Sequence, residues 1–281
     1  MPNIIKYFLF KTFIVIFISS RMNASEIVEL LDKTYTQDNK FKFVADTHVY
    51  TYGTDVYTSV TTFLQRFHKP FKMDYWAEIK AAERGITKDE ILNEWKETNL
   101  KSTIIGSALH EHIEYYFKGI YTPLTNNMDL IRRINKFNII FAQKLYKLTP
   151  VVFEQKIFSK RLRIAGTIDS IFIYEGKIYI IDWKSNKSLK TDDHPKGKYE
   201  KLLKPFNKFY KNELNEYSIQ LSLYALILSE IGIKVDDMFL VHIPDEGDVK
   251  IYKTVDMRDI LNSYFDDAYF NSLNDVKQEI N

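Results

Sequence analysis

A change of hydrophobic pattern after Pro150 constrains the fold of this chain more than any other feature. Before it, apolar residues recur at helical spacing, as they do through 129–148. After it come three short segments rich in β-branched and aromatic residues, at 151–158, 163–174 and 177–184. Such segments, separated by short turns, are typical of neighbouring strands. The sequence therefore predicts a sheet built from a meander in the middle of the chain.

The segments on either side of the meander are mostly helical in pattern. Ser25 is a candidate N-cap for a first helix that ends at Leu31. Further helices are predicted at 58–67, 71–84, 86–97, 104–117, 129–148, 213–231 and 257–280, a hairpin at 41–53, and short strands at 238–243 and 249–255. This order predicts an α/β or α+β core with one sheet and a helical N-terminal portion. No internal repeat or linker divides 23–281, so we expect one domain with a lysine-rich insertion at 185–211.

Residues 1–22 form an apolar segment of a different character. It carries lysine and arginine but no acidic residue, and its longest uninterrupted apolar run, 13–18, is shorter than the roughly 20 residues that span a bilayer. Three interpretations stay open: a targeting segment, an interfacial anchor, or an extension upstream of a start at Met22.

A two-residue Glu-Gly loop between the second and third strands fixes their register. With that loop Tyr174 faces Lys177, and Asp169 then lies opposite Asp182 with Cβ atoms roughly 4.5–5.5 Å apart. Side chains alternate along a strand, so Lys184 shares a face with Asp182. If Lys160 pairs with Arg163 around a two-residue Arg161-Leu162 loop at the preceding turn, Glu154 lies opposite Asp169. Three carboxylates are therefore predicted in one row across three strands.

Such a row requires compensating positive charge. Two carboxylates about 5 Å apart repel by about 3 kcal/mol at an effective dielectric of 20. Lys184 supplies one positive charge, and a divalent cation with oxygen ligands would supply the rest. The alternative is a solvent-facing strand on which two aspartates pair with neighbouring lysines.

Two predicted helices carry further polar residues on one face each. His110 and Glu114 are four residues apart, and Gly106 one turn earlier permits close approach of another backbone. His110 would add an imidazole to an oxygen-rich site, or else is a buried structural histidine. Gln220 and Tyr224 share a face in the same way, which an amphipathic core helix also explains.

The connector after the third strand is strongly basic. Nine lysines lie between 184 and 211 against three acidic residues, with aromatic residues between them. A solvated loop is one interpretation; the other is an arm that contacts phosphates and stacks bases on the aromatic rings. The residues we expect to contribute are Lys187, Phe206, Phe209 and Tyr210, together with Arg161 and Arg163 at the strand ends.

Composition excludes several classes of protein. The 281 residues contain no cysteine, so disulfide scaffolds, cysteine-bound zinc, iron–sulfur clusters and thiol nucleophiles are all ruled out. A formal net charge of +2 disfavours a globally basic nucleic-acid binder but allows a local basic patch.

Together these residues resemble a known family. Glu154, then Gly166-Thr167-Ile168-Asp169, then Asp182-Trp183-Lys184, then Gln220 and Tyr224 resemble the PD-(D/E)xK nucleases of the RecB type, and the segment from Gly106 to Glu114 resembles that branch's histidine motif. The chain is most similar to single-domain exonucleases related to the mitochondrial genome maintenance exonuclease and to viral recombination nucleases. The resemblance implies a restriction-endonuclease-like α/β core, with a central mixed sheet flanked by helices.

The resemblance also implies roles for these residues. His110, Asp169 and Asp182 would bind the metal, with the Trp183 carbonyl facing it, and Glu154 would be a further ligand or an outer acid. Lys184 would position or activate the attacking water and stabilise the developing charge on phosphorus. Glu114, Gln220 and Tyr224 would brace the site or contact nucleic acid. Mg²⁺ suits such ligands, Mn²⁺ is a substitute, and no iron–sulfur cluster is expected.

These inferences predict a Mg²⁺-dependent deoxyribonuclease, most simply an exonuclease acting on single strands or DNA ends in replication, repair or recombination. The alternatives are a structure-specific endonuclease of the same fold, a non-catalytic DNA-binding recombination accessory protein and, on 4–20 alone, a membrane-associated protein. Cleavage is expected to be sequence-tolerant. A helicase or single-strand-binding protein would supply any unwinding, because no G-x-x-x-x-G-K-[ST] motif is present. We expect the chain to act inside the cell, in the cytoplasm, nucleus or mitochondrion.

Overall fold

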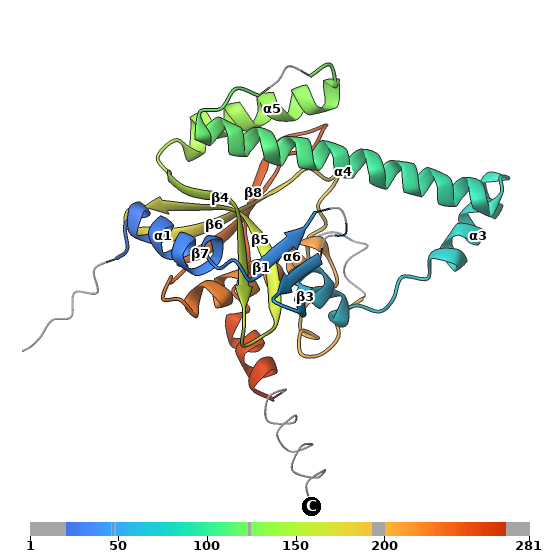
Figure 1. Cartoon of the computed structure of the whole chain (residues 1–281). Helices are drawn as coiled ribbons and strands as arrows, with labels where there is room; N and C mark the ends of the chain where they lie inside the picture. The colour runs from blue at the N-terminus through green and yellow to red at the C-terminus, as the bar shows by residue number, and fades with distance from the viewer. Residues whose placement is uncertain (1–20, 46, 48, 123–124, 193–199, 268–281) are drawn as a thin grey trace, which may run out of the picture.

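The computed structural model describes residues 21–45, 47, 49–122, 125–192 and 200–267. Apart from Arg21 and Met22, the predicted N-terminal segment lies outside this part of the chain. Within it, a mixed sheet is flanked by helices on both faces, and α4 reaches well beyond the edge of the sheet (Figure 1). The predicted α/β fold with a central mixed sheet is confirmed.

The sheet has eight strands in the order β1-β2-β3-β5-β6-β7-β8, with β4 paired to β5 beside this path. The pairs β3–β5 and β6–β7 are parallel, and the other pairs are antiparallel. The strands are β1 (Phe41–Val44), β2 (Val49–Tyr52), β3 (Asp55–Ser59), β4 (Thr149–Ser159), β5 (Ile164–Tyr174), β6 (Lys177–Lys184), β7 (Asp237–His242) and β8 (Lys250–Lys253). The hairpin, the meander and both later strands are confirmed. Only β3 was missed, because its last two residues belong to the pattern that predicts a helix at 58–67.

The helices are α1 (Ala24–Leu31), α2 (Val60–Leu64), α3 (Met73–Arg84), α4 (Lys88–Lys118), α5 (Met128–Ile140), α6 (Glu213–Ser229) and a final helix at 258–267. Short 3₁₀ or π turns extend α1, α2 and α5. The N-cap of α1 is Asn23 rather than Ser25, whose hydroxyl donates to the Asn23 side chain. The predicted end of the last helix, beyond 267, lies outside the described residues.

The largest error of the sequence prediction concerns α4. It starts within the helix predicted at 86–97, with Thr87 as its N-cap, but it does not end near residue 97. The helix spans 31 residues, Lys88–Lys118, and Gly119 after it adopts the left-handed conformation (φ 66°). The intervening residues, 98–103, are polar except for Leu100 and contain neither proline nor glycine, so nothing in the backbone stops the helix. Two predicted helices are therefore one.

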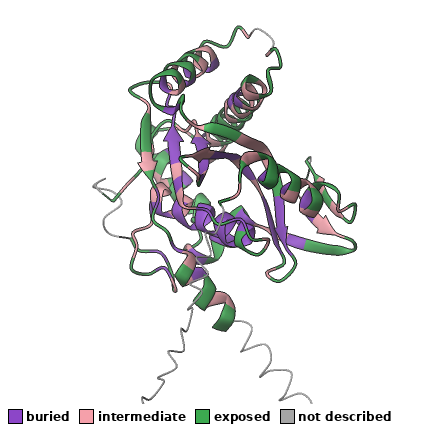
Figure 2. Ribbon diagram, turned by 90° about the vertical axis from the view of Figure 1, so that its left-hand side faces the viewer, coloured by how far each residue is buried: buried purple, intermediate pink, exposed green. Residues whose placement is uncertain are grey.

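Side chains alternate along β6 between two hydrophobic cores. Figure 2 shows the buried residues gathered in the central strands and the elements packed against them. Ile181 and Trp183 face α4 and α5. Ile178 and Ile180 face the side of α6, a helix whose residues are buried through most of its length. Asp182 and Lys184 follow Ile178 and Ile180 on the same face of β6, up to the end of the strand. The alternation thus places one acidic and one basic side chain at the border of a core.

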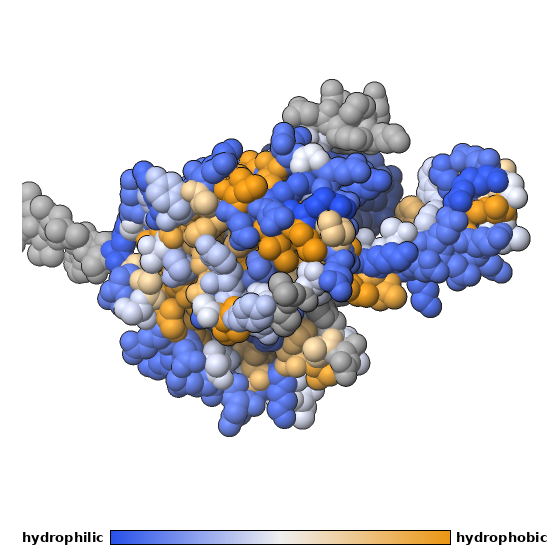
Figure 3. Space-filling view, turned by 90° about the horizontal axis from the view of Figure 1, so that it is seen from above, coloured by the Kyte–Doolittle hydropathy of each residue, from blue (hydrophilic) through white to orange (hydrophobic). Residues whose placement is uncertain are grey.

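The first part of α4 and all of α3 form an arm that projects from the body. A small core of Ala77, Ala81 and Ile91 holds the two helices together. Seen from above, the arm is a lobe with a largely hydrophilic surface and scattered hydrophobic residues (Figure 3). Among the described residues, every helix is too short or too polar to cross a bilayer.

The basic connector packs more tightly than we expected. Phe206 is fully buried, with its ring centroid 4.7 Å from that of Phe67, so the prediction that it stacks on bases is wrong. Phe209 packs partly against the same core. Asp192 accepts hydrogen bonds from Asn212 and Asn215, which ties the connector to the first turn of α6. Residues 193–199 lie outside the described part.

Candidate active site

The predicted site lies where two strands part along one edge of β5. On that edge β3 pairs with residues 164–165 and β6 pairs with residues 170–174. No described strand pairs with residues 166–169 there. The backbone N–H of Trp183 donates instead to the carboxylate of Asp169, at 2.9 Å. The gap between β3 and β6 along this edge of β5 leaves room for side chains from the helices to reach the sheet.

The predicted strand registers are confirmed. Ser170 faces Ile181, and one step further along the same register lies the pair Asp169 and Asp182. Phe153 faces Ser170 and Gln155 faces Ile168, which places Glu154 at the level of Asp169. The loop before β5 is longer than expected, because 160–163 lie outside both strands, but the register is unchanged.

Glu154 has a backbone conformation that is rare for its residue type. Its φ angle is 48°, in the left-handed region, although both neighbours remain paired in the strand. Such a conformation costs on the order of 1–3 kcal/mol in a residue other than glycine, and it persists where the surroundings enforce it, often at functional sites. The distortion marks this position of β4 as a candidate for function.

Three of the predicted residues converge at one point. The Nδ1 atom of His110 lies 3.2 Å from the carboxylate of Glu154 and 3.6 Å from that of Asp169. Ligand atoms from these three side chains all lie within 4.8 Å of one another, the only such group found in the described residues. Two carboxylate oxygens and one imidazole nitrogen at this spacing suit a hard divalent cation.

His110 is oriented for this role by the backbone. Its Nε2 atom lies 2.8 Å from the carbonyl oxygen of Trp183, which directs Nδ1 toward the two carboxylates. Burial would lower the pKa of His110, but Asp169 and Glu154 outweigh burial and raise the pKa to about 9. The Trp183 carbonyl, expected to face the ion, thus contacts the histidine instead. That the Trp183 carbonyl binds a metal stays a prediction.

Asp182 and Lys184 form a buried pair beside this group. The Nζ atom of Lys184 lies 2.6 Å from Oδ2 of Asp182, whose side chain is 1% exposed. Burial and the charge of Asp169 raise the pKa of Asp182, whereas Lys184 opposes this rise. Burial would lower the pKa of Lys184, but the two aspartates hold it above its usual value, so the ammonium stays charged. Direct metal ligation by Asp182 also stays a prediction.

Gln220 and Tyr224 join the site from α6. The amide of Gln220 donates to Oδ1 of Asp182 and to the hydroxyl of Tyr224, at 3.3 Å in each case. Tyr224 is buried and lies directly over Gly166, where a Cβ atom would be 2.7 Å from the ring. Position 166 of β5 must therefore be glycine, because the Tyr224 ring of α6 occupies the space that a side chain would need.

Gly106 has a similar but weaker role on α4. A Cβ atom there would lie 3.3 Å from the hydroxyl oxygen of Ser185, which follows Lys184. The helix therefore crosses closely over the end of β6. This close crossing brings His110, one turn further along α4, to the carboxylates.

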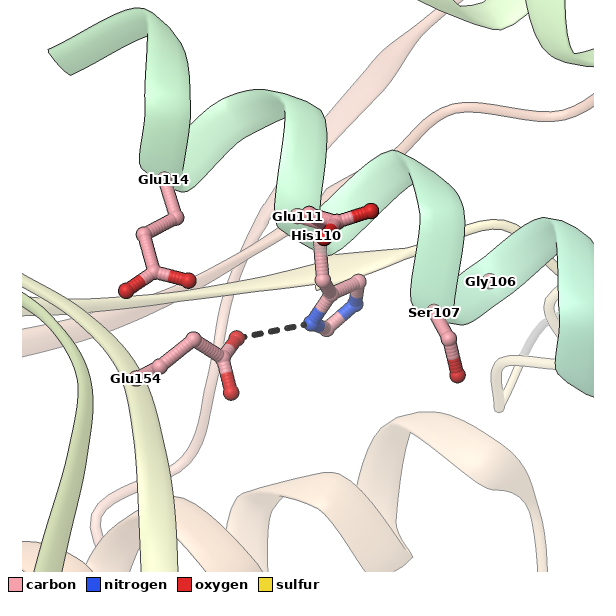
Figure 4. A pocket seen from close by; sticks show the side chains of 6 residues that line it. All are labelled: Gly106, Ser107, His110, Glu111, Glu114 and Glu154. Atoms are coloured by element: carbon pink, nitrogen blue, oxygen red, sulfur yellow. Dashed lines mark hydrogen bonds and ion pairs between the residues drawn. The ribbon is translucent and has the colours of Figure 1, made fainter. Parts of the chain in front are cut away.

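A cavity of about 450 Å³ opens between α4 and β4 (Figure 4). The dashed contact between His110 and Glu154 spans it. Glu114, predicted as a supporting residue, is also in its wall and pairs with Lys118 at 2.5 Å. Sequence reasoning did not select Ser107 and Glu111. Ser107 lies three residues before His110, so a helical projection would have placed it on the same face, whereas Glu111 lies on an adjacent face. The lining residues are Gly106, Ser107, His110, Glu111, Glu114 and Glu154.

Three predicted nucleic-acid contacts lie away from this cavity. Arg161 pairs with Glu230 at 3.0 Å and Arg163 with Asp55 at 3.4 Å, at the tip of the β4–β5 hairpin. Lys187 is exposed and lines a separate cavity across α4. The structure does not bring these three cations to the cluster of His110, Glu154 and Asp169, and their contact with nucleic acid stays a prediction.

A family model of the PD-(D/E)XK nuclease superfamily matches residues 58–281, which include every site residue described above. The chain belongs to this superfamily. The predicted resemblance and the restriction-endonuclease-like fold are therefore confirmed at the level of the superfamily, and the nuclease class is established with them. No curated protein matches the chain.

Two solved structures are similar to this nuclease at low identity. One, a candidate exonuclease from Eubacterium rectale, is 12% identical with a TM-score of 0.36, and the match covers 74% of this chain and 76% of that one. The other, SSO0001, is 16% identical with a TM-score of 0.23, over 53% of this chain. The match spans 63% of the length of SSO0001.

Proposed function

We propose that this nuclease is a divalent-metal-dependent DNA exonuclease that acts on single strands or DNA ends. One observation carries the proposal: the His110, Glu154 and Asp169 cluster lies beside the buried Asp182–Lys184 pair. Negative and positive groups in this arrangement suit metal-assisted hydrolysis of a phosphodiester. Mg²⁺ is the metal we expect, with Mn²⁺ as a substitute because one ligand is an imidazole.

His110, Glu154 and Asp169 would hold the cation. A divalent ion bound there would supply Lewis-acid chemistry, polarising the scissile phosphate and making water a better nucleophile at neutral pH. The protein contributes orientation, because the Trp183 carbonyl fixes the imidazole and the Trp183 N–H fixes the Asp169 carboxylate. Both ligands are thus positioned by the same residue of β6, immediately before Lys184.

Lys184 contributes a fixed positive charge. Its side chain is 18% exposed, so it reaches solvent from a largely buried position. A charge held in such a place stabilises the negative charge that develops on the phosphate in the transition state, and it needs no reorganisation to do so. Asp182 keeps the ammonium protonated and in place, and Gln220 holds Asp182 from the other side.

Sequence-tolerant binding is what the composition of the connector suggests. The connector is rich in lysine, and lysines recognise the phosphate backbone rather than base edges. We therefore propose DNA of any sequence as the substrate, with a role in replication, repair or recombination. A helicase or a single-strand-binding protein would be the partner wherever duplex must be opened.

The test uses DNA in four forms, linear and circular, each single- and double-stranded, with labelled linear RNA beside them. The linear forms carry an end label and the circles an internal label. Each substrate is incubated with the full chain in Mg²⁺, in Mn²⁺ and in EDTA. We expect short products from linear single strands or from DNA ends, intact circles, little action on RNA, and no cleavage in EDTA. Lys184→Ala should lower the rate by about 10²–10³, the usual cost of losing a group that stabilises transition-state charge.

Lys177→Ala is the matched control, because Lys177 is exposed at the opposite end of the same strand. It should cleave as the wild type does. Cut circles would instead indicate the structure-specific endonuclease. DNA binding without cleavage under any metal condition would indicate the accessory protein. Cleavage that survives EDTA or Lys184→Ala would refute the assigned site.

A further inference from the structure

The side chain of Tyr217 lies against the catalytic lysine. The Nζ atom of Lys184 is 4.5 Å from the centroid of the Tyr217 ring, and the side chain of Tyr217 is half-buried. A cation at this distance from a ring face is attracted by the ring's negative face, more strongly where water is excluded. The Lys184 ammonium is therefore held on two sides, by the Asp182 carboxylate at 2.6 Å and by the aromatic ring.

The position of Tyr217 on α6 supports a shared task. Tyr217, Gln220 and Tyr224 are spaced i, i+3 and i+7, so they lie along one face of the helix. Gln220 contacts Asp182, and Tyr224 contacts Gln220. Tyr217 extends the same face by one turn, to the other member of the buried pair. One face of α6 thus contacts both Asp182 and Lys184 at the end of β6.

The first turn of α6 is itself firmly placed. The Asn212 side chain caps the helix by accepting from the N–H of Asn215, and both asparagines donate to Asp192 of the connector. Tyr217 directly follows this turn, so the anchored start of the helix limits where its side chain can lie. A lysine, by contrast, has four rotatable bonds and a compact charge that can point in many directions.

We propose that Tyr217 is a positioning residue, which fixes the Lys184 ammonium toward the phosphate through the face of its ring. The inference rests on the proposed nuclease function. The aromatic ring, and not the hydroxyl, performs this task, because the ring face is what the ammonium contacts. Removing the ring frees the lysine to adopt unproductive rotamers without changing the groups that hold metal or DNA.

The kinetic test compares Tyr217→Leu with Tyr217→Phe on the DNA substrate that the wild type cleaves best. We expect Tyr217→Leu to lower kcat roughly tenfold, the size expected for a partly desolvated cation–π contact, with KM within about twofold of the wild type. Tyr217→Phe keeps the ring and should retain kcat within about twofold. Tyr52→Leu is the matched control, because Lys160 lies 4.4 Å from the Tyr52 ring, at a distance from the site.

A spectroscopic measurement tests the contact without any activity. The ring face should move the proton signals of the Lys184 side chain upfield in NMR spectra of lysine ammonium and ε-methylene groups, with Lys184→Arg used for assignment. Tyr217→Leu should remove this shift and Tyr217→Phe should keep it. Circular dichroism and thermal denaturation check that each variant folds.

Three results would overturn the proposal: wild-type kcat in a folded Tyr217→Leu variant, equal loss of kcat in the Phe and Leu variants, or Lys184 signals that do not move when the ring is removed. If the wild type cleaves no nucleic acid, the proposed function fails. The NMR shift then still decides whether Tyr217 holds the lysine.

Discussion

Gly166 offers the sharpest test of how the site is assembled, because its lack of a side chain is a requirement of the packing. A Cβ atom at this position would lie 2.7 Å from Cε1 of Tyr224, 3.1 Å from a methyl of Val60 and 3.2 Å from the Tyr224 hydroxyl. The first distance is far shorter than a normal contact of about 3.5–4.0 Å between carbon atoms. Gly166→Ala must therefore displace the tyrosine ring or the strand.

The magnitude follows from two opposing effects. Where the backbone tolerates it, replacing glycine by alanine stabilises a protein by about 0.4–1 kcal/mol through the unfolded chain. Forcing an extra carbon into a packed core costs about 1–3 kcal/mol. Tyr224 is 3% exposed and lies within a continuous core, so it has little room to move. We expect the steric cost to win, with a net loss of about 1–2 kcal/mol in the free energy of unfolding.

The assay is urea denaturation followed by circular dichroism, with thermal denaturation beside it. Gly106→Ala is the matched control, since its Cβ would meet only the Ser185 hydroxyl, at 3.3 Å, and a helix interior favours alanine over glycine by about 1 kcal/mol. Gly106→Ala should be neutral or stabilising, whereas Gly166→Ala should lower the midpoint. Because Tyr224 accepts the hydrogen bond of Gln220, Gly166→Ala should also lower nuclease activity.

A double-mutant cycle with Tyr224→Leu identifies the clash. Tyr224→Leu removes the ring, so the alanine at 166 should cost much less in that background than in the wild type, with a coupling energy above about 0.5 kcal/mol. Equal stability of Gly166→Ala and wild type, or strict additivity in the cycle, would refute the reasoning.

Two further predictions concern protonation. Burial raises the pKa of Glu216 to about 7, although nearby lysines act to lower it. Because the pKa of Glu216 is higher in the folded than in the unfolded state, its contribution to the free energy of unfolding is fully present below its ordinary pKa. This contribution is lost as pH rises through about 7. Glu216→Gln should therefore match the stability of the wild type near pH 4 and exceed it by about 1–3 kcal/mol at pH 8. Denaturation in EDTA measures both stabilities. The same difference in stability at pH 4 and at pH 8 would contradict the prediction. His110, with its pKa raised to about 9, must release its proton to bind a cation. Calorimetric affinity for Mn²⁺ should accordingly rise between pH 6.5 and 9 with net proton release, and His110→Gln should abolish the pH dependence, with His112→Gln as the control on the same helix.

The sequence predicted the meander and its register well, because both depend on local rules. The Glu-Gly loop fixes the pairing of β5 with β6, and alternation then assigns Asp182 and Lys184 to one face. The register of β4 survived even though the loop before β5 is longer than predicted. Once the hydrophobic pattern fixes which face of a strand is buried, a one-residue slip would expose it, so the pairing is strongly specified.

Features that depend on contacts between distant segments were predicted less well. The burial of Phe206 results from its packing against Phe67. The half-buried position of His112, whose ring packs edge-on against Phe137, is a similar case, since helical spacing alone does not reveal that contact. The continuity of α4 escaped detection because a polar middle section suggests a break, although only proline or glycine would have enforced one.

The sequence by itself determined that this chain contains a sheet with acidic residues in register, a lysine two positions beyond one of them and no cysteine that could bind a metal. Only the tertiary structure decided which of these side chains form the candidate metal site and which form the buried ion pair. It grouped Glu154 and Asp169 with His110 of α4 as a candidate metal site, and paired Asp182 with Lys184 under α6. The physical reason is that a strand register fixes positions within the sheet alone. The helices above and below the sheet decide which charges are neutralised by which partners, and their placement depends on close approaches, such as that of Tyr224 to Gly166, that span the whole chain.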